Sequence, residues 1–152
     1  MTSPLHLGVR RLGRGGADVE LSLELASDLA LIAEAVELLA AHCPAGILSP
    51  RRIRFNFRTV LAEALANAIT YGNGGDPEKH VHVRVVAAAA DAVRVWVADD
   101  GDGFDPGDVP DPTTPGRLTA EAGRGLFVMR HLVDAVDFNE KGNLVCLTLR
   151  AG

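Results

Sequence analysis

Two side chains able to do chemistry lie four residues apart in the run Glu63-Ala-Leu-Ala-Asn67. A spacing of four places them on one face of a helix, at the edge of the apolar stripe of the same segment. The Glu63 carboxylate could accept a proton or orient a hydroxyl, and the Asn67 oxygen could ligate Mg²⁺, which takes oxygen ligands. Taken alone, the two are better explained as ordinary polar residues at the boundary of a core.

A second polar group, Asp-Asp-Gly-Asp-Gly at 99–103, directly follows an expected strand. A carboxylate at a strand end can accept a hydrogen bond from an exocyclic amine such as that of adenine, and glycines let the backbone pass close to a flat ring. An ordinary turn has the same composition. A calcium loop does not fit, because Asp105 stands at the sixth position, where Gly is needed, and Asp111 at the twelfth, where Glu is needed.

A third group, Gly-Arg-Gly-Leu at 123–126, stands where a helix is expected to begin. The free N–H groups and positive dipole end of a helix suit a phosphate, and Arg124 could add positive charge. A Gly-x-Gly alone is weak support for such a site. The segment is no P-loop, since no Gly-Lys-Ser/Thr follows, and no dinucleotide fingerprint, since no strand enters it.

The strands that must position these groups show one apolar and one mixed face. Apolar and polar residues alternate over 19–25, 81–85 and 93–97, the last two forming a hairpin, and two short strands close the chain around 141–143. A sheet covered on both sides would be apolar throughout. The pattern therefore predicts an α+β fold, a two-layer sandwich with helices on one face of a mixed, mostly antiparallel sheet.

Three helices are expected in the covering layer. The first has Ser27 as its N-cap and ends near Cys43. The second begins at Ser49-Pro50, as N-cap and first helical residue, and ends at Gly72. It carries Glu63 and Asn67, and the third follows the glycine motif at 123–125.

The remaining segments and the composition set the domain organisation. Residues 1–16 are rich in Gly and Arg without a clear period and are predicted to be a flexible arm before one domain over 17–152. The segment 104–120 carries prolines at 106, 110, 112 and 115. Because structureless loops longer than about 12–15 residues are usually lids or disordered, its place between two glycine motifs favours a lid.

The charge and the cysteines exclude several classes of protein. With 15 basic and 20 acidic side chains the net charge is −5, which argues against direct nucleic-acid binding. No apolar run approaches the ~20 residues that span a bilayer, and the N-terminus lacks a signal-peptide core. Cys43 and Cys146 lack zinc-site spacing. We expect a cytoplasmic protein with no membrane contact.

In their order along the chain, the three motifs resemble those of the GHKL, or Bergerat-fold, ATPases, over roughly residues 18–150. The residues that match that family's N box and two glycine boxes are Glu63, Asn67, Asp99, Gly101, Gly103, Gly123, Gly125 and Leu126. Within the superfamily, the runs 63–73 and 123–134 are most similar to the anti-sigma regulatory factor (RsbW-like) serine kinases. Tyr71 stands where sensor histidine kinases usually carry Lys.

The resemblance implies a binding site for ATP and Mg²⁺. Asn67 would hold Mg²⁺, Asp99 would bind adenine, and residues 123–125, including Arg124, would hold the phosphates under the 104–120 lid. Glu63 would orient or deprotonate the protein hydroxyl that attacks the γ-phosphate. Phosphoryl transfer needs mainly positioning and charge stabilisation, so a site with few residues is sufficient.

The same resemblance implies a serine/threonine protein kinase of a partner-switching pathway. Such a protein sequesters a sigma factor, phosphorylates a STAS-domain antagonist and is often a homodimer. The alternative is a non-catalytic nucleotide-binding module that docks to a sigma factor or another regulator. A detached histidine-kinase catalytic domain is a third interpretation, weakened by the missing Lys at position 71.

Overall fold

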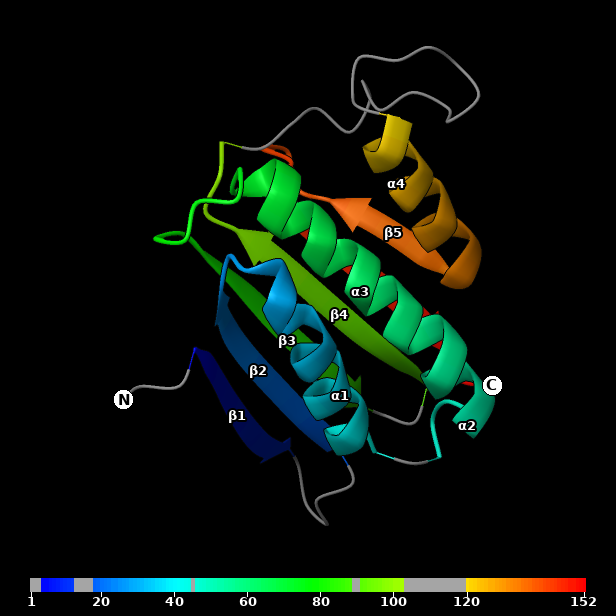
Figure 1. The fold of residues 1–152 in the computed structure, drawn as a ribbon. Helices are drawn as coiled ribbons and strands as arrows, with labels where there is room; N and C mark the ends of the chain where they lie inside the picture. Colours follow the sequence, from blue (N-terminus) through cyan, green and yellow to red (C-terminus); the bar gives the residue numbers. More distant parts are fainter. Residues whose placement is uncertain (1–3, 13–17, 45, 89–90, 103–119) are drawn as a thin grey trace.

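The computed structural model describes residues 4–12, 18–44, 46–88, 91–102 and 120–152 of the chain. The described strands form one sheet in the order β1-β2-β3-β4-β6-β5, and each neighbouring pair is antiparallel. The strands are β1 (Leu5–Leu12), β2 (Asp18–Ala26), β3 (His80–Ala88), β4 (Ala92–Asp99), β5 (Ala135–Phe138) and β6 (Leu144–Arg150). Helices cover one face of this sheet (Figure 1), which confirms the predicted two-layer α+β sandwich.

The helical layer consists of α1 (Ile32–His42), a long composite helix and α4 (Ala120–Leu132). The composite helix runs continuously through α2 (Pro50–Arg52), the π-helical turn η2 (Ile53–Phe57), α3 (Arg58–Asn67) and the π-helical turn η3 (Ala68–Gly72). Its predicted limits are confirmed. The Ser49 hydroxyl accepts the Arg52 N–H at 3.2 Å, and the last helical residue is Gly72.

The core lies between the sheet and the helices. Leu21, Leu23 and Leu25 of β2 point into it and are at most 2% exposed, because successive strand side chains alternate between the faces. Phe57 and Leu61 of the composite helix are fully buried in the same core. Each such side chain contributes about 1.5–3 kcal/mol by leaving water, so the helix that carries the predicted site is firmly anchored to the sheet.

The N-terminal segment departs from the sequence prediction. Leu5–Leu12 form the edge strand β1, which pairs with β2 from Leu5↔Leu25 to Leu12↔Asp18, so a flexible arm over 1–16 is wrong for these residues. The strand is held because Leu5 is buried and Leu7 packs against the core. His6, which lies between them, is exposed on the open face of the sheet.

The first helical segment also begins differently from the prediction. Asp28, not Ser27, caps a 3₁₀ turn η1 (Leu29–Leu31) ahead of α1, and its carboxylate accepts the Ala30 N–H at 2.9 Å. Ser27 is buried and its hydroxyl donates to the Lys79 carbonyl at 2.8 Å. The hydroxyl therefore serves a long-range contact instead of the cap.

Across the described part of the chain, no helix is both long and apolar enough to cross a membrane.

Candidate functional site

Glu63 and Asn67 lie on the face of α3 that meets α4, as their spacing predicts. The contact is made by Gly125, which is buried in α4. A Cβ atom at this glycine would lie 2.8 Å from Glu63 Oε2 and 3.5 Å from Asn67 Nδ2. The first of these distances is shorter than a carbon–oxygen contact allows, so a side chain at this position would push the Glu63 carboxylate aside.

Asp99 ends β4 on the other side of the same region, between two glycines. A Cβ atom at Gly72 would overlap the Asp99 carboxylate, and one at Gly101 would overlap the Gly72 carbonyl. The Asp99 backbone is fixed because its N–H donates to the Asn143 carbonyl at 3.0 Å, and Asp99 Oδ1 accepts the Gly101 N–H at 2.8 Å. The carboxylate thus stands in a narrow slot walled by backbone.

The surroundings of Asp99 change its acidity. Burial raises the pKa of this half-buried carboxyl above its usual value, and the hydrogen bond from the Gly101 N–H opposes the shift. The neighbouring charge of Asp100 raises the pKa further, whereas Lys79 and Lys141 lower it. A carboxylate that is partly removed from water in this way gains more from a ligand's hydrogen-bond donor than an exposed one does.

A narrow cavity of about 50 Å³ joins Asn67 to Asp99. Asn143 completes its polar side, and its apolar side includes Val97 and Met129. This volume is well below the roughly 300–1,000 Å³ of sites that enclose a whole small molecule. It has room for only one edge of a flat ring, beside the Asp99 carboxylate.

The third predicted motif occupies a different place on its helix from the one expected. The helix α4 begins at Ala120, so residues 123–126 lie inside its first two turns and not before them. Ala120, Glu121 and Ala122 favour helix formation and extend α4 toward the N-terminus. The free N–H groups of the helix therefore belong to residues ahead of the glycine motif.

The remaining predicted site residues fall into two groups. Gly103 and the expected lid, up to residue 119, lie outside the described residues, as do the surroundings of Gly123 and Arg124. Leu126 is 4% exposed and packs in the hydrophobic core. It therefore anchors α4 beneath the site.

Sequence reasoning missed Asn73, which directly follows the composite helix. Its side chain is 2% exposed, accepts the Asp100 N–H at 2.8 Å and donates to Ser27 Oγ at 2.8 Å. The local sequence gave little sign of this role, since an Asn after a helix-ending Gly is an ordinary turn residue. The partners come from segments that meet only in the folded chain.

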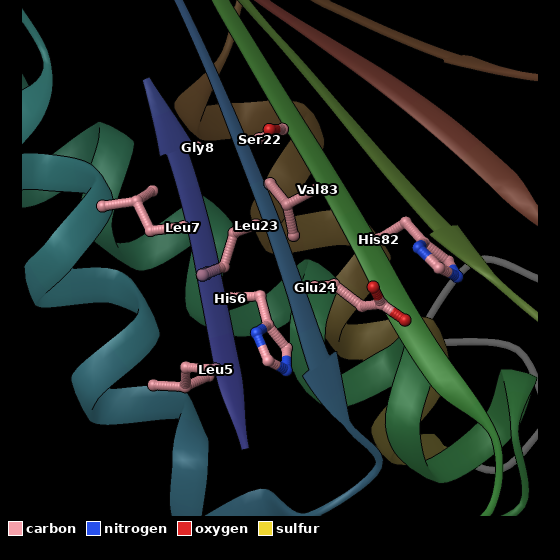
Figure 2. A pocket seen from close by; sticks show the side chains of 9 residues that line it. All are labelled: Leu5, His6, Leu7, Gly8, Ser22, Leu23, Glu24, His82 and Val83. Atoms are coloured by element: carbon pink, nitrogen blue, oxygen red, sulfur yellow. The ribbon is translucent and has the colours of Figure 1, made fainter. Parts of the chain in front are cut away.

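A second, larger hollow of about 610 Å³ lies on the open face of the sheet over β1, β2 and β3 (Figure 2). His6, Glu24 and His82 face each other across the three strands there. None of the predicted site residues lines it. Among the described residues, no group of three or more His, Cys, Asp or Glu side chains is arranged to hold a metal ion.

The candidate site thus combines a helix-borne Glu–Asn pair with a half-buried Asp between glycines, on a sandwich with one open face. The chain matches the family model of the histidine kinase-like ATPase domain over residues 25–149. It therefore belongs to that family and to the GHKL superfamily, which supports ATP binding and a kinase-like function. No curated protein matches the chain.

Proposed function

We propose that the chain is an ATP-dependent serine/threonine protein kinase of the anti-sigma-factor type. Its substrate is a Ser or Thr hydroxyl of a STAS-domain antagonist, and its other partner is a sigma factor or an equivalent regulator. We further propose that it acts in the cytoplasm as a homodimer. The observation that carries the proposal is that Glu63 and Asn67 face Gly125 while Asp99 stands between Gly72 and Gly101, in a chain of the histidine kinase-like ATPase family.

The adenine end of the site is assigned to Asp99. The ionised carboxylate accepts a hydrogen bond from the exocyclic amine, and the backbone at Gly72 and Gly101 leaves room for a planar ring beside it. Val97 and Met129 supply the apolar surface of the cavity next to Asp99. A guanine ring presents a carbonyl at the position of that amine, so Asp99 selects ATP over GTP.

The phosphate end of the site is assigned to the region where α3 meets α4. The donor there is the Asn67 amide oxygen, and an oxygen ligand fits Mg²⁺. Mg²⁺ is usually held by one or two protein oxygens together with substrate phosphates, so a dedicated cage of carboxylates is not required. When bound, the ion would neutralise charge on the transferred phosphoryl group.

Glu63 is assigned as the catalytic base. It accepts the proton of the Ser or Thr hydroxyl, whose oxygen forms a bond to the γ-phosphorus while the bond from that phosphorus to the β–γ bridging oxygen breaks. The products are a phosphorylated antagonist and ADP. Such a transition state needs mainly orientation and charge stabilisation. The absence of a side chain at Gly125 leaves the Glu63 carboxylate in the position that this orientation requires.

Two measurements test the proposal. Calorimetry should show Mg²⁺-dependent ATP binding by the wild-type chain that is lost in both Asn67→Ala and Asp99→Asn. Glu63→Gln, which keeps the side-chain shape but removes the base, should bind ATP yet lose at least 100-fold in phosphate transfer to candidate STAS proteins.

The chemical stability of the product separates the remaining possibilities. An acid-stable phosphoester on the STAS protein supports a serine/threonine kinase, whereas an acid-labile product indicates a histidine kinase. A folded wild-type chain that binds no ATP would contradict the proposal and favour a docking module.

A further inference from the structure

Asn73 joins the end of the composite helix to the strand ends around Asp99. Its backbone N–H donates to the Ala68 carbonyl at 2.8 Å, which ties it to the last helical turn. Its side-chain Nδ2 donates to Ser27 Oγ at 2.8 Å and to the His80 carbonyl at 3.0 Å. Its Oδ1 accepts the Asp100 N–H at 2.8 Å.

Both ends of this amide are therefore used inside the fold. Asn73 is 2% exposed and Ser27 is 5% exposed, and the Ser27 hydroxyl passes the chain of hydrogen bonds on to the Lys79 carbonyl at 2.8 Å. A buried amide gives up its hydrogen bonds to water, and each bond must be replaced within the protein. These bonds link the end of β2, the start of β3 and the end of β4 to one side chain.

The contact with Asp100 bears directly on Asp99. The Asp100 N–H belongs to the peptide unit that follows Asp99, so Asn73 fixes this unit on one side while the Asn143 carbonyl holds the Asp99 N–H on the other. The Asp100 carboxylate in turn accepts the His80 N–H at 2.8 Å. The orientation of the Asp99 side chain thereby depends on Asn73 and His80, which do not line the cavity, as well as on Asn143, which does.

Asn73 also adjoins the glycine that forms one wall of the slot. Gly72 precedes it in the chain, and the Gly72 carbonyl lies against Gly101. Asn73 thus holds the end of the composite helix and the loop after β4 in fixed positions relative to each other.

We propose that Asn73 is a positioning residue for nucleotide recognition, which keeps the Asp99 carboxylate directed into the slot between Gly72 and Gly101. The inference rests on the proposed function, in which Asp99 binds adenine. Asn73 does not touch the nucleotide and acts through the Asp100 peptide. Its removal should therefore weaken ATP binding and also weaken the preference for ATP over GTP, since both depend on where Asp99 points.

The matched control is Asp134, which lies between α4 and β5 and contacts Arg52 at the far end of the composite helix. Asp134 Oδ2 accepts the Arg150 N–H at 2.7 Å and pairs with Arg52 at 3.3 Å, so Asp134→Ala also breaks hydrogen bonds between elements. Arg52 lies near the start of the composite helix and Asn73 just after its end, roughly 30 Å apart at 1.5 Å per residue. The control therefore loses structural hydrogen bonds without affecting the nucleotide site.

The experiment measures ATP and GTP dissociation constants by calorimetry, with Mg²⁺, for the wild type, Asn73→Ala and Asp134→Ala, each verified as folded by circular dichroism. We expect Asn73→Ala to bind ATP at least 10-fold more weakly and to lose most of its preference over GTP. Asp134→Ala should melt at a lower temperature with unchanged dissociation constants. If Asn73→Ala does not fold, Ser27→Ala, which removes one acceptor of the Asn73 amide, should weaken ATP binding about 3-fold.

The outcomes separate this inference from the proposed function. ATP affinity and selectivity within 2-fold of the wild type in folded Asn73→Ala, or in Ser27→Ala where that variant replaces it, would overturn the role of Asn73 and leave the ATP site standing. Equal losses of affinity in Asn73→Ala and Asp134→Ala would show a general effect of stability and also overturn it. A folded wild type that binds no ATP would overturn the proposed function and this inference with it.

Discussion

Backbone contacts at three glycines shape the candidate site at the scale of single residues. Gly125 lets α4 reach Glu63, and Gly72 and Gly101 close around Asp99. None of these three glycines is in the left-handed conformation that favours glycine. Among the described residues, the glycines with a positive φ are others, such as Gly74 and Gly75. Space, not backbone conformation, requires glycine most strictly at Gly101, where the obstacle is the Gly72 backbone carbonyl, so even alanine should interfere there.

Gly101→Ala is the sharpest test of this requirement. The new Cβ would overlap the Gly72 carbonyl, which forces the loop after β4 away from the helix end and displaces Asp99. We expect ATP affinity to fall by at least 100-fold in calorimetry while circular dichroism still shows the folded domain. Neither the helices nor the strands need Gly101 for their own packing.

The control for that substitution is Gly74→Ala. Gly74 has a φ of +62° and open space around its Cβ position, so alanine costs about 1–2 kcal/mol in backbone strain without touching the slot. We expect Gly74→Ala to lower the unfolding free energy and keep the ATP affinity of the wild type. Equal affinity in Gly101→Ala and Gly74→Ala would contradict the steric argument.

The raised pKa of Asp99 predicts how ATP binding depends on pH. Only the ionised carboxylate accepts a hydrogen bond from the adenine amine without a competing proton. Affinity should therefore be complete above this raised pKa and decline as the pH falls through it, at a higher pH than for an exposed aspartate. Calorimetric titration across acidic pH measures this midpoint, and a decline that begins only in the ordinary aspartate range would contradict it.

The same shift has the opposite sign for stability. The folded chain holds the Asp99 proton more tightly than the unfolded chain does. The contribution of Asp99 to the unfolding free energy therefore falls as the pH rises from its unfolded pKa through its folded pKa. Replacing Asp99 by Asn removes the charge, and we expect Asp99→Asn to unfold at a higher urea concentration than the wild type at neutral pH. A less stable variant would show that the hydrogen bond from the Gly101 N–H outweighs burial.

At the scale of elements, sequence pattern predicted those whose apolar period is uninterrupted. The alternation over 19–25 and the hairpin over 81–97 were placed correctly, as was the composite helix from Ser49 to Gly72. In β1 the same alternation of Leu5, Leu7 and Val9 exists, but Gly8 and the arginines between and after them masked it. Gly8 and Arg10 fall on the open face, where the fold does not demand apolar side chains, whereas Arg11 is on the core side, opposite Val19 near the end of the edge strand.

The start of α4 and the role of Asn73 could not be predicted from sequence for another reason. A glycine pair marks a helix start only if the residues before it do not extend the helix, and Ala120–Ala122 do extend it. Asn73 contacts Ser27 and Asp100, which are far from it along the chain. The spacing of four between Glu63 and Asn67 was predictable because it is local.

The edge strand β1 should contribute measurably to stability through Leu5. This side chain is 8% exposed, whereas Val9 on the same strand is 52% exposed. We expect Leu5→Ala to lower the unfolding free energy by about 2 kcal/mol, at the low end for a buried leucine because the strand lies at the sheet edge. Val9→Ala should change it by less than about 0.5 kcal/mol.

Urea denaturation measures both variants on the full chain. Equal, small effects would show that residues 5–12 add little to the fold, as a flexible arm would. ATP affinity should be unchanged in both variants, because β1 is separated from β4 by β2 and β3 in the sheet.

At the scale of the whole molecule, the two faces of the sheet have different roles. The helical face carries the core and the candidate site, whereas the open face carries paired charges and a cation–aromatic contact. Arg84 pairs with Glu20 at 2.9 Å and lies 5.0 Å from the Trp96 ring. Such exposed pairs contribute little to stability, so most of the folding free energy comes from the layer that also positions Glu63, Asn67 and Asp99. Ligand binding at the site should therefore raise the unfolding free energy of the whole domain.

This coupling gives a prediction on thermal unfolding. A ligand that binds only the folded state at 100 times its dissociation constant stabilises it by about 2.7 kcal/mol. For a domain of this size, that raises the midpoint of thermal unfolding by about 5–10 °C. Mg²⁺ and ATP together should produce this shift in the wild type and in Gly74→Ala. ATP with a chelator should produce a smaller one, because Asn67 then lacks the ion that links it to the phosphates. Asp99→Asn and Gly101→Ala should show almost none, and a full shift in either would place ATP elsewhere on the molecule.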